Sequence, residues 1–172
     1  MHKIEFNRVV LLAEKPLIGM RASMTRAADA TPALWQRFMP RRGEVANAIG
    51  ESLYSVQLFS GVAAFENFTP DTVFEKWAAV EVDGTSGVPD GMESLSLSAG
   101  HYAVFDHQGP PGEFAKSLYY IFVEWLPQSE WQLDDRPHFE VLQPGWRADD
   151  PEAREEVWIP VRQAVAEEES DL

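Results

Sequence analysis

The chain has 172 residues and carries 14 Lys and Arg against 28 Asp and Glu, which gives a formal net charge of −14. This acidic balance argues against direct binding to nucleic acid or to an anionic membrane, because both attract clustered basic side chains. A hydrophobic fraction of 45% excludes a disordered chain, and the absence of cysteine excludes disulfides, thiolate nucleophiles and zinc–thiolate or iron–sulfur centres.

The first half of the chain has the pattern of a strand, a helix and two further strands. A strand is predicted over 16–24. The pair Thr31-Pro32 predicts the start of a helix, since Thr is a good N-cap residue and Pro is favoured in the first turn. Runs rich in Val and aromatic residues predict strands over 53–59 and 74–82.

The second half repeats this order. A strand over 101–107 is followed by a helix over 113–126, whose apolar positions recur at the spacing of one buried face. Strands over 138–142 and 155–161 complete the second half.

The repetition predicts a tandem β-α-β-β duplication, hence an α+β fold with an antiparallel sheet and two main helices on one face. A segment dense in turn formers, 83–91, separates the halves, and a strand over 92–98 links them. The junction between the halves is then a natural groove for a ligand. The predicted organisation is a single domain over 1–162, with pseudo-repeats at about 14–83 and 99–162, and an acidic tail over 163–172.

Signatures of the common catalytic classes are absent, including GxSxG, GxxxxGK[ST], HExxH and GxGxxG. The four histidines are scattered, and His101 and His107 on one predicted strand are too few to indicate a metal. The pairs Asp149-Asp150 and Glu155-Glu156 lie beside turn residues, which indicates a solvated surface, and they lack the ligand spacing of a calcium loop. We therefore predict no metal site and no cofactor.

Glu140 stands out in the predicted strand over 138–142. Strict alternation sends Phe139 and Val141 to one face of the sheet, and His138 and Glu140 to the other. A carboxylate among apolar and aromatic neighbours is costly unless it is solvated, paired or able to meet a charged ligand. On alternation alone, an exposed strand face and a functional carboxylate both fit.

Four segments stand out in the second half: GHYAVFDHQG at 100–109, WLPQS at 125–129, RPHFE at 136–140, and DDP at 149–151 followed by VWIPV at 157–161. In this order they resemble the motifs of the GyrI-like or AraC-type effector-binding, small-molecule-binding domain. The first resembles that family's opening strand, the second its helix end, the third its R-P-x-F-E strand and the fourth its closing hairpin. Many members carry Tyr two residues after the motif Glu, where this chain has Leu142, so a hydroxyl partner for the carboxylate is missing or comes from elsewhere.

The resemblance implies that the two units form one curved sheet, with a ligand groove between the helices and Glu140 on the groove floor. Members occur as effector modules of AraC- and MerR-type multidrug regulators, as stand-alone gyrase-inhibitor-like proteins and as hydrolases of cyclopropanoid compounds. A buried carboxylate ringed by aromatic side chains attracts lipophilic cations through Coulomb and cation–π interactions. From strand facing and helix position, the predicted walls of the groove are Tyr54, Trp77, Tyr119 and Trp158, with Phe38 behind them.

Three functions follow as hypotheses. The first is binding of lipophilic, cationic, largely aromatic small molecules for drug sensing or sequestration. The second is a hydrolase of strained small molecules, in which Glu140 is the general base and Tyr119 orients the substrate or donates a proton. The third is an acidic inhibitor that imitates DNA to occupy a DNA-acting enzyme.

The expected setting is that of a cytoplasmic, stand-alone protein. The chain begins almost at once with strand material, no segment resembles a signal peptide, and no apolar run approaches the ~20 residues that span a bilayer. We expect a small-molecule partner, with a protein as a second candidate partner, no direct nucleic-acid binding and no membrane association. Oligomeric state stays open.

Overall fold

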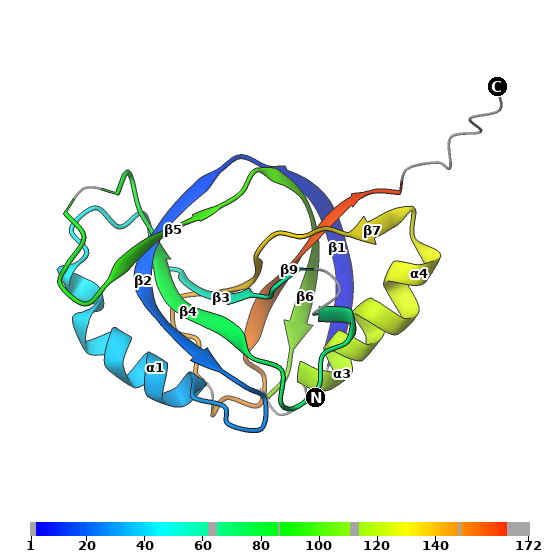
Figure 1. Ribbon diagram of the computed structural model, residues 1–172, viewed down its shortest axis with the longest axis horizontal. Helices are drawn as coiled ribbons and strands as arrows, with labels where there is room; N and C mark the ends of the chain where they lie inside the picture. Colours follow the sequence, from blue (N-terminus) through cyan, green and yellow to red (C-terminus); the bar gives the residue numbers. More distant parts are fainter. Residues whose placement is uncertain (1–2, 62–64, 86, 111–113, 148, 165–172) are drawn as a thin grey trace.

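The computed structural model describes residues 3–61, 65–85, 87–110, 114–147 and 149–164. Figure 1 shows the strands curving round the middle of the molecule, with the helices at its periphery. The strands are β1 (Lys3–Leu12), β2 (Lys15–Met24), β3 (Leu53–Leu58), β4 (Phe74–Glu81), β5 (Glu93–Leu97), β6 (Gly100–Gln108), β7 (Trp131–Leu133), β8 (His138–Leu142) and β9 (Arg154–Gln163). The helical segments are α1 (Thr31–Phe38), the 3₁₀ segment η1 (Met39–Glu44), α3 (Phe114–Tyr119), the π-helical segment η3 (Tyr120–Trp125) and α4 (Leu126–Gln128).

The strands form one antiparallel sheet in the order β1-β6-β9-β8-β3-β4-β2-β5, and β7 pairs with β9 beside this path. The units β2-α1-β3-β4 and β6-α3-β8-β9 occupy the two halves of this order and meet where β3 pairs with β8. The predicted α+β duplication with a curved antiparallel sheet and two main helices is therefore confirmed.

Two rows of paired residues define the two faces of the sheet. One row runs Ala78, Ser55, Glu140, Val157 and Phe105 across strands β4, β3, β8, β9 and β6. The next row, on the opposite face, runs Trp77, Val56, Phe139, Trp158 and Val104 across the same strands. Because directly paired residues share a face, the first row marks what we call the helix face and the second what we call the inner face.

Two packed clusters lie on the helix face and one on the inner face. On the helix face, α1 buries Leu34 and Phe38 against strands of the first half. On the same face, Ile121 of η3 packs against Phe105 and Ile159 of the second half. The inner face holds an aromatic core formed by Tyr54, Trp77, Tyr102, Phe139 and Trp158. Both helices thus cover one side of the sheet, and the aromatic core fills the other.

The structure adds two strands that the sequence pattern did not predict. Strand β1 pairs with β6 at the edge of the sheet and is mostly exposed, so its sequence carries little alternation. Strand β7 has only 3 residues. The helix predicted to stop at Pro127 continues through it to Gln128, since Pro is tolerated in the first turn of α4. Of the predicted acidic tail, residues 165–172 lie outside the described residues.

Gly19 on β2 is required by close approach of backbones. A Cβ added there would lie 2.0 Å from the carbonyl oxygen of Ala78 and 2.6 Å from Cα of Ala79. We expect Gly19→Ala to lower the free energy of unfolding by about 1–3 kcal/mol, because backbone must shift to make room. Gly43→Ala is the matched control, since a Cβ there meets nothing within 4 Å, and urea unfolding of both variants makes the comparison. Equal stability of the two variants would contradict this packing.

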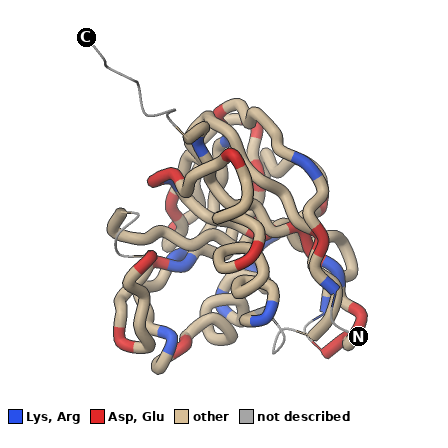
Figure 2. The backbone as a smooth tube through the Cα atoms, turned by 90° about the vertical axis from the view of Figure 1, so that its right-hand side faces the viewer, with Lys and Arg blue, Asp and Glu red and all other residues tan. Residues whose placement is uncertain are grey.

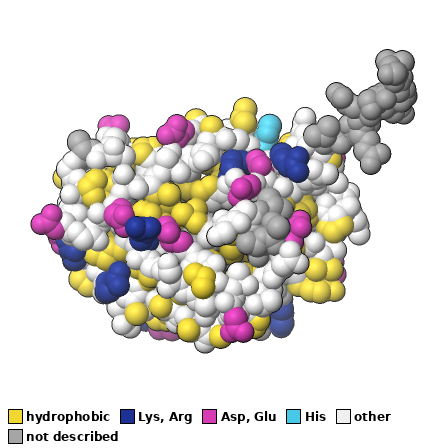
Figure 3. Space-filling view, viewed as in Figure 1, with side chains coloured by type: hydrophobic (Ala, Val, Ile, Leu, Met, Phe, Trp, Pro, Cys, Tyr) yellow, Lys and Arg dark blue, Asp and Glu magenta, His cyan; other side chains and the backbone are white. Residues whose placement is uncertain are grey.

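Charged residues are spread over the chain. Figure 2 shows acidic residues on many segments, with Lys and Arg among them. On the side seen in Figure 1, hydrophobic side chains gather in the middle of the surface between acidic and basic ones (Figure 3). Among the described residues, no helix combines the length and apolarity that a membrane crossing requires.

Candidate functional site

A pocket of about 730 Å³ lies on the helix face, between the sheet and the segment formed by α3 and η3. Its floor comes from the four central strands β4, β3, β8 and β9, where the two halves meet. The floor residues are Gln57, Lys76, His138, Glu140, Val157 and Ile159, and the helical wall is Ala115, Leu118, Tyr119, Phe122 and Val123. The volume falls within the usual range for small-molecule sites, roughly 300–1,000 Å³.

Phenylalanine rings form the side walls of this pocket. Phe59, Phe65, Phe68 and Phe74 line it from the end of β3, the following segment and the start of β4. The ring centroids of Phe59 and Phe65 lie 5.0 Å apart, and those of Phe65 and Phe122 lie 4.6 Å apart. These contacts join the first-half wall to the helical wall, so aromatic surface surrounds the polar floor on two sides.

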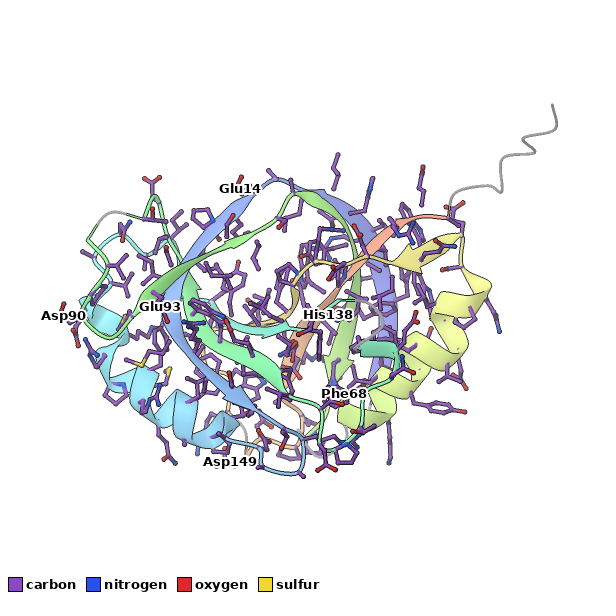
Figure 4. The ribbon with its side chains drawn as sticks, in the orientation of Figure 1. Glu14, Phe68, Asp90, Glu93, His138 and Asp149 are labelled. Carbon is purple, nitrogen blue, oxygen red and sulfur yellow. The ribbon has the colours of Figure 1, made fainter. Side chains whose placement is uncertain are left out.

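His138 belongs to this aromatic wall. Its ring centroid lies 5.0 Å from that of Phe59 and 4.8 Å from that of Phe65. In Figure 4 it lies near the middle of the molecule, and Phe68 lies lower, towards α3. Burial lowers the pKa of His138 to about 3, so its imidazole is neutral at pH 7 and adds an uncharged aromatic surface.

Glu140 is the carboxylate on the pocket floor. It is only 7% exposed, at the centre of β8, between Ser55 on β3 and Val157 on β9. Its Oε1 accepts a hydrogen bond of 3.3 Å from Nε2 of Gln57, so an amide takes the place of the hydroxyl partner that Leu142 removes. Burial raises the pKa of Glu140, and the charge of Lys76 and the Gln57 hydrogen bond oppose this shift in part.

A second carboxylate, Glu155, lies on the same face of the neighbouring strand β9. Glu155 pairs with Leu142 on β8. On the helix face, this pair is the next one along the two strands after the pair of Glu140 and Val157. Burial, followed by the negative charge of Glu140, raises the pKa of Glu155 to about 8. Glu155 is half-buried, so it does not lie on the fully solvated surface that its turn-like neighbours predict, because the β9 register turns its side chain to the helix face.

The structure separates the six predicted site residues into three places. Glu140 and Tyr119 line the pocket, and Tyr119 is 60% exposed at its edge. Tyr54, Trp77 and Trp158 lie in the aromatic core of the inner face. Phe38, the last residue of α1, is fully buried between this helix and the sheet.

The inner-face position of the three residues follows from strand alternation. Trp158 pairs directly with Phe139, the residue before Glu140, so its ring points away from the pocket. The indole Nε1 of Trp158 donates to Glu156 at 3.2 Å, and that of Trp77 donates to Glu75 at 2.6 Å. The Tyr54 hydroxyl donates to Glu81 at 3.3 Å. The structure brings these residues together with each other and not with Glu140.

The aromatic walls that sequence reasoning missed carried a signal. Phe59, Phe65, Phe68 and Phe74 follow one another through a segment that links two strands. Such a density of large apolar residues in a connection is unusual, because connections run over the surface.

Within the described part of the chain, no group of three or more His, Asp and Glu side chains is arranged to hold a metal ion.

The chain matches the family described as GyrI-like small molecule binding domain over residues 7–162. It is 27% identical over 154 residues to the transcriptional regulator BrlR of Pseudomonas aeruginosa. That match covers 87% of this chain and 54% of BrlR, so the chain spans about half the length of this curated relative.

Two solved structures share the fold. The structure of SAV2435 bound to tetraphenylphosphonium has a TM-score of 0.67 at 19% identity, covering 90% of this chain and 93% of that chain. EcmrR, in a complex with DNA, has a TM-score of 0.68 at 14% identity, covering 95% of this chain and 58% of that chain. The fold therefore occurs in a protein bound to a lipophilic cation and in a protein bound to DNA.

Proposed function

Because this chain belongs to the family of GyrI-like small molecule binding domains, we propose that its pocket binds lipophilic, cationic, aromatic small molecules. The observation that carries the proposal is the burial of Glu140 on the floor of a pocket walled by phenylalanine rings. Glu140 is the anchor, Phe59, Phe65 and Phe122 are the walls, and Tyr119 stands at the edge.

Burial of the Glu140 carboxylate costs free energy when the group is ionised. An ionised carboxylate out of water is destabilising unless a counter-charge or hydrogen bonds offset the loss of hydration. Glu140 accepts a hydrogen bond from Gln57, and the charge of a bound cation offsets the remaining cost of burying the carboxylate. Aromatic rings around the same cation add about 0.5–2 kcal/mol each through cation–π attraction. Flat walls of this kind select for charge and for aromatic surface more than for one outline.

The biological role that we propose is drug sensing or sequestration. SAV2435, which shares the fold, is bound to tetraphenylphosphonium, and BrlR is a transcriptional regulator. The chain spans about half of BrlR, so a part in transcription regulation belongs to this proposal and depends on a partner that reads the bound state.

The test compares ligands of matched shape and different charge. We expect calorimetric titration to give binding of tetraphenylphosphonium, much weaker binding of neutral triphenylphosphine oxide, and no binding of tetraphenylborate. The reason is that tetraphenylborate presents the same four rings with a negative charge that the carboxylate repels. Equal affinity for the cation and the anion would contradict the proposal.

Hydrolysis is a second candidate, favoured by the raised pKa of Glu140. A buried carboxyl group with a raised pKa is a stronger base towards water than an exposed one. Tyr119 lines the same pocket and supplies a hydroxyl that could orient a substrate. Turnover of a cyclopropanoid substrate by the wild-type protein, lost in Glu140→Gln, would establish this activity, and binding without product would exclude it for that substrate.

A further inference from the structure

Glu140, which is buried, and Glu155, which is half-buried, lie between two hollows with different linings. Glu140 lines the aromatic pocket, and Glu155 lines a polar hollow of about 430 Å³ at the ends of β6 and β9. The register joins them, because Glu140 pairs with Val157 and Glu155 lies two residues before Val157 on the same face. Residues in this diagonal relation have side chains within mutual reach when both are long.

The charged and titratable groups around the pair come from every neighbouring element. Lys76 on β4 exerts its positive charge on both carboxylates. His107 on β6 lies directly opposite Glu155, and its Nδ1 lies 3.1 Å from Oγ of Ser117 on α3. The remaining ones that line the two hollows are His138, Tyr119, Arg26 and Asp29 on the aromatic side, and Lys3, Glu5, Asp106, Arg154 and Glu156 on the polar side.

The net charge of the pocket floor in the ligand-free protein depends on how many of its carboxylates are ionised. Two ionised carboxylates beside Lys76 would leave one uncompensated negative charge at a place where Glu140 is almost entirely buried. Two carboxylates that share a site do not both ionise readily, since each disfavours the charge of the other. One retained proton makes the floor neutral when no ligand is present.

We propose that Glu140 and Glu155 share one proton in the free protein and that a cation entering the aromatic pocket displaces it. The inference rests on the proposed binding of lipophilic cations. A carboxyl O–H bond breaks, its electron pair stays on the carboxylate, and the proton passes to water or a buffer base. The floor is then neutral in both states, with the cation in the place of the proton.

The polar hollow gives the displaced proton a path to water that is separate from the entrance used by the ligand. Its lining is largely charged and exposed, including Glu5, Asp106 and Arg154 at the surface end, so water reaches Glu155 from that side. The ligand approaches Glu140 from the aromatic side. Proton release and ligand entry therefore do not compete for the same opening.

The proposal is tested by calorimetric titration of tetraphenylphosphonium in phosphate and in bis-Tris at pH 6–7, since the two buffers differ in ionisation enthalpy. We expect the wild-type protein to release close to one proton per bound cation, and its affinity to rise about tenfold per pH unit over this range. Glu155→Gln should bind the cation with much less proton release and a flatter pH dependence. Glu152→Gln is the control, because this exposed glutamate lines neither hollow, and it should release protons like the wild type.

Binding without proton release in the wild type, or equal release by Glu155→Gln, would overturn the inference and leave the proposed function intact. Absence of cation binding at every pH would overturn both. A carbon-detected NMR titration of the ligand-free wild type needs no variant to fold. It should show one carboxyl of the pair protonated at pH 7, and ionisation of both below pH 5 would overturn the inference.

Discussion

Replacement of Glu140 by glutamine is expected to weaken binding of tetraphenylphosphonium by about 30- to 100-fold, which corresponds to the loss of one desolvated charge pair. Glutamine keeps the size and planarity of the side chain and can still bond to Gln57, so the pocket keeps its shape. The variant lacks only the electrostatic attraction between the carboxylate and the ligand cation, which is strong where little water screens it. Calorimetry or ligand fluorescence measures the change directly.

Two controls make the effect of Glu140→Gln specific to charge at this position. Glu51→Gln changes an exposed glutamate and the net charge by the same amount, and it should leave affinity unchanged. Neutral triphenylphosphine oxide should bind the wild type and Glu140→Gln equally. Loss of affinity for the neutral ligand in Glu140→Gln would mean that the substitution had damaged the pocket and would contradict the charge argument.

The second large effect is expected on stability, from Phe139→Ala. Phe139 is 1% exposed, lies stacked on Trp158 at 5.1 Å and contacts Tyr102 edge-on at 5.1 Å. Removal of this ring leaves a cavity in the aromatic core of the inner face, and the free energy of unfolding should fall by about 3–5 kcal/mol. Urea unfolding followed by tryptophan fluorescence measures the loss. Cation affinity of the folded variant should change by less than about threefold, because the ring faces away from the pocket.

Phe122→Ala is the matched comparison on the other face. Phe122 is half-buried and lines the pocket beside Phe65. We expect a stability loss of about half that of Phe139→Ala or less, and a loss of cation affinity of about 3- to 30-fold from the missing ring. If Phe139→Ala weakened binding more than Phe122→Ala in the folded proteins, the assignment of faces would be contradicted.

The fold could be predicted from the sequence because its signals are local. The start of α1 at Thr31 and the Pro in its first turn agree with the prediction, although Ala30 and not Thr31 is the N-cap residue. The strands at the core of each unit carry runs of Val and aromatic residues that can be recognised within single segments. Strand β1 was not predicted, because an exposed edge strand does not need to alternate apolar and polar residues. The resemblance to a known family then supplied the curvature of the sheet and the position of Glu140 on the groove floor.

The walls of the site required information that no single segment carries. Trp158 is close to Glu140 in the sheet, yet the pairing of Trp158 with Phe139 turns the two functional candidates to opposite faces. That register depends on how β8 and β9 align across the long hairpin between them. Glu155 was predicted on a solvated surface for the same reason, since its turn-like neighbours gave no sign that β9 turns it to the helix face beside Glu140.

The most direct test of the central claim is a structure of the protein with tetraphenylphosphonium bound. The account predicts the phosphonium centre over the carboxylate of Glu140 on the helix face, with phenyl rings against Phe59, Phe65 and Phe122. Density for the ligand on the inner face beside Trp77 and Trp158, with the carboxylate of Glu140 out of contact, would contradict it.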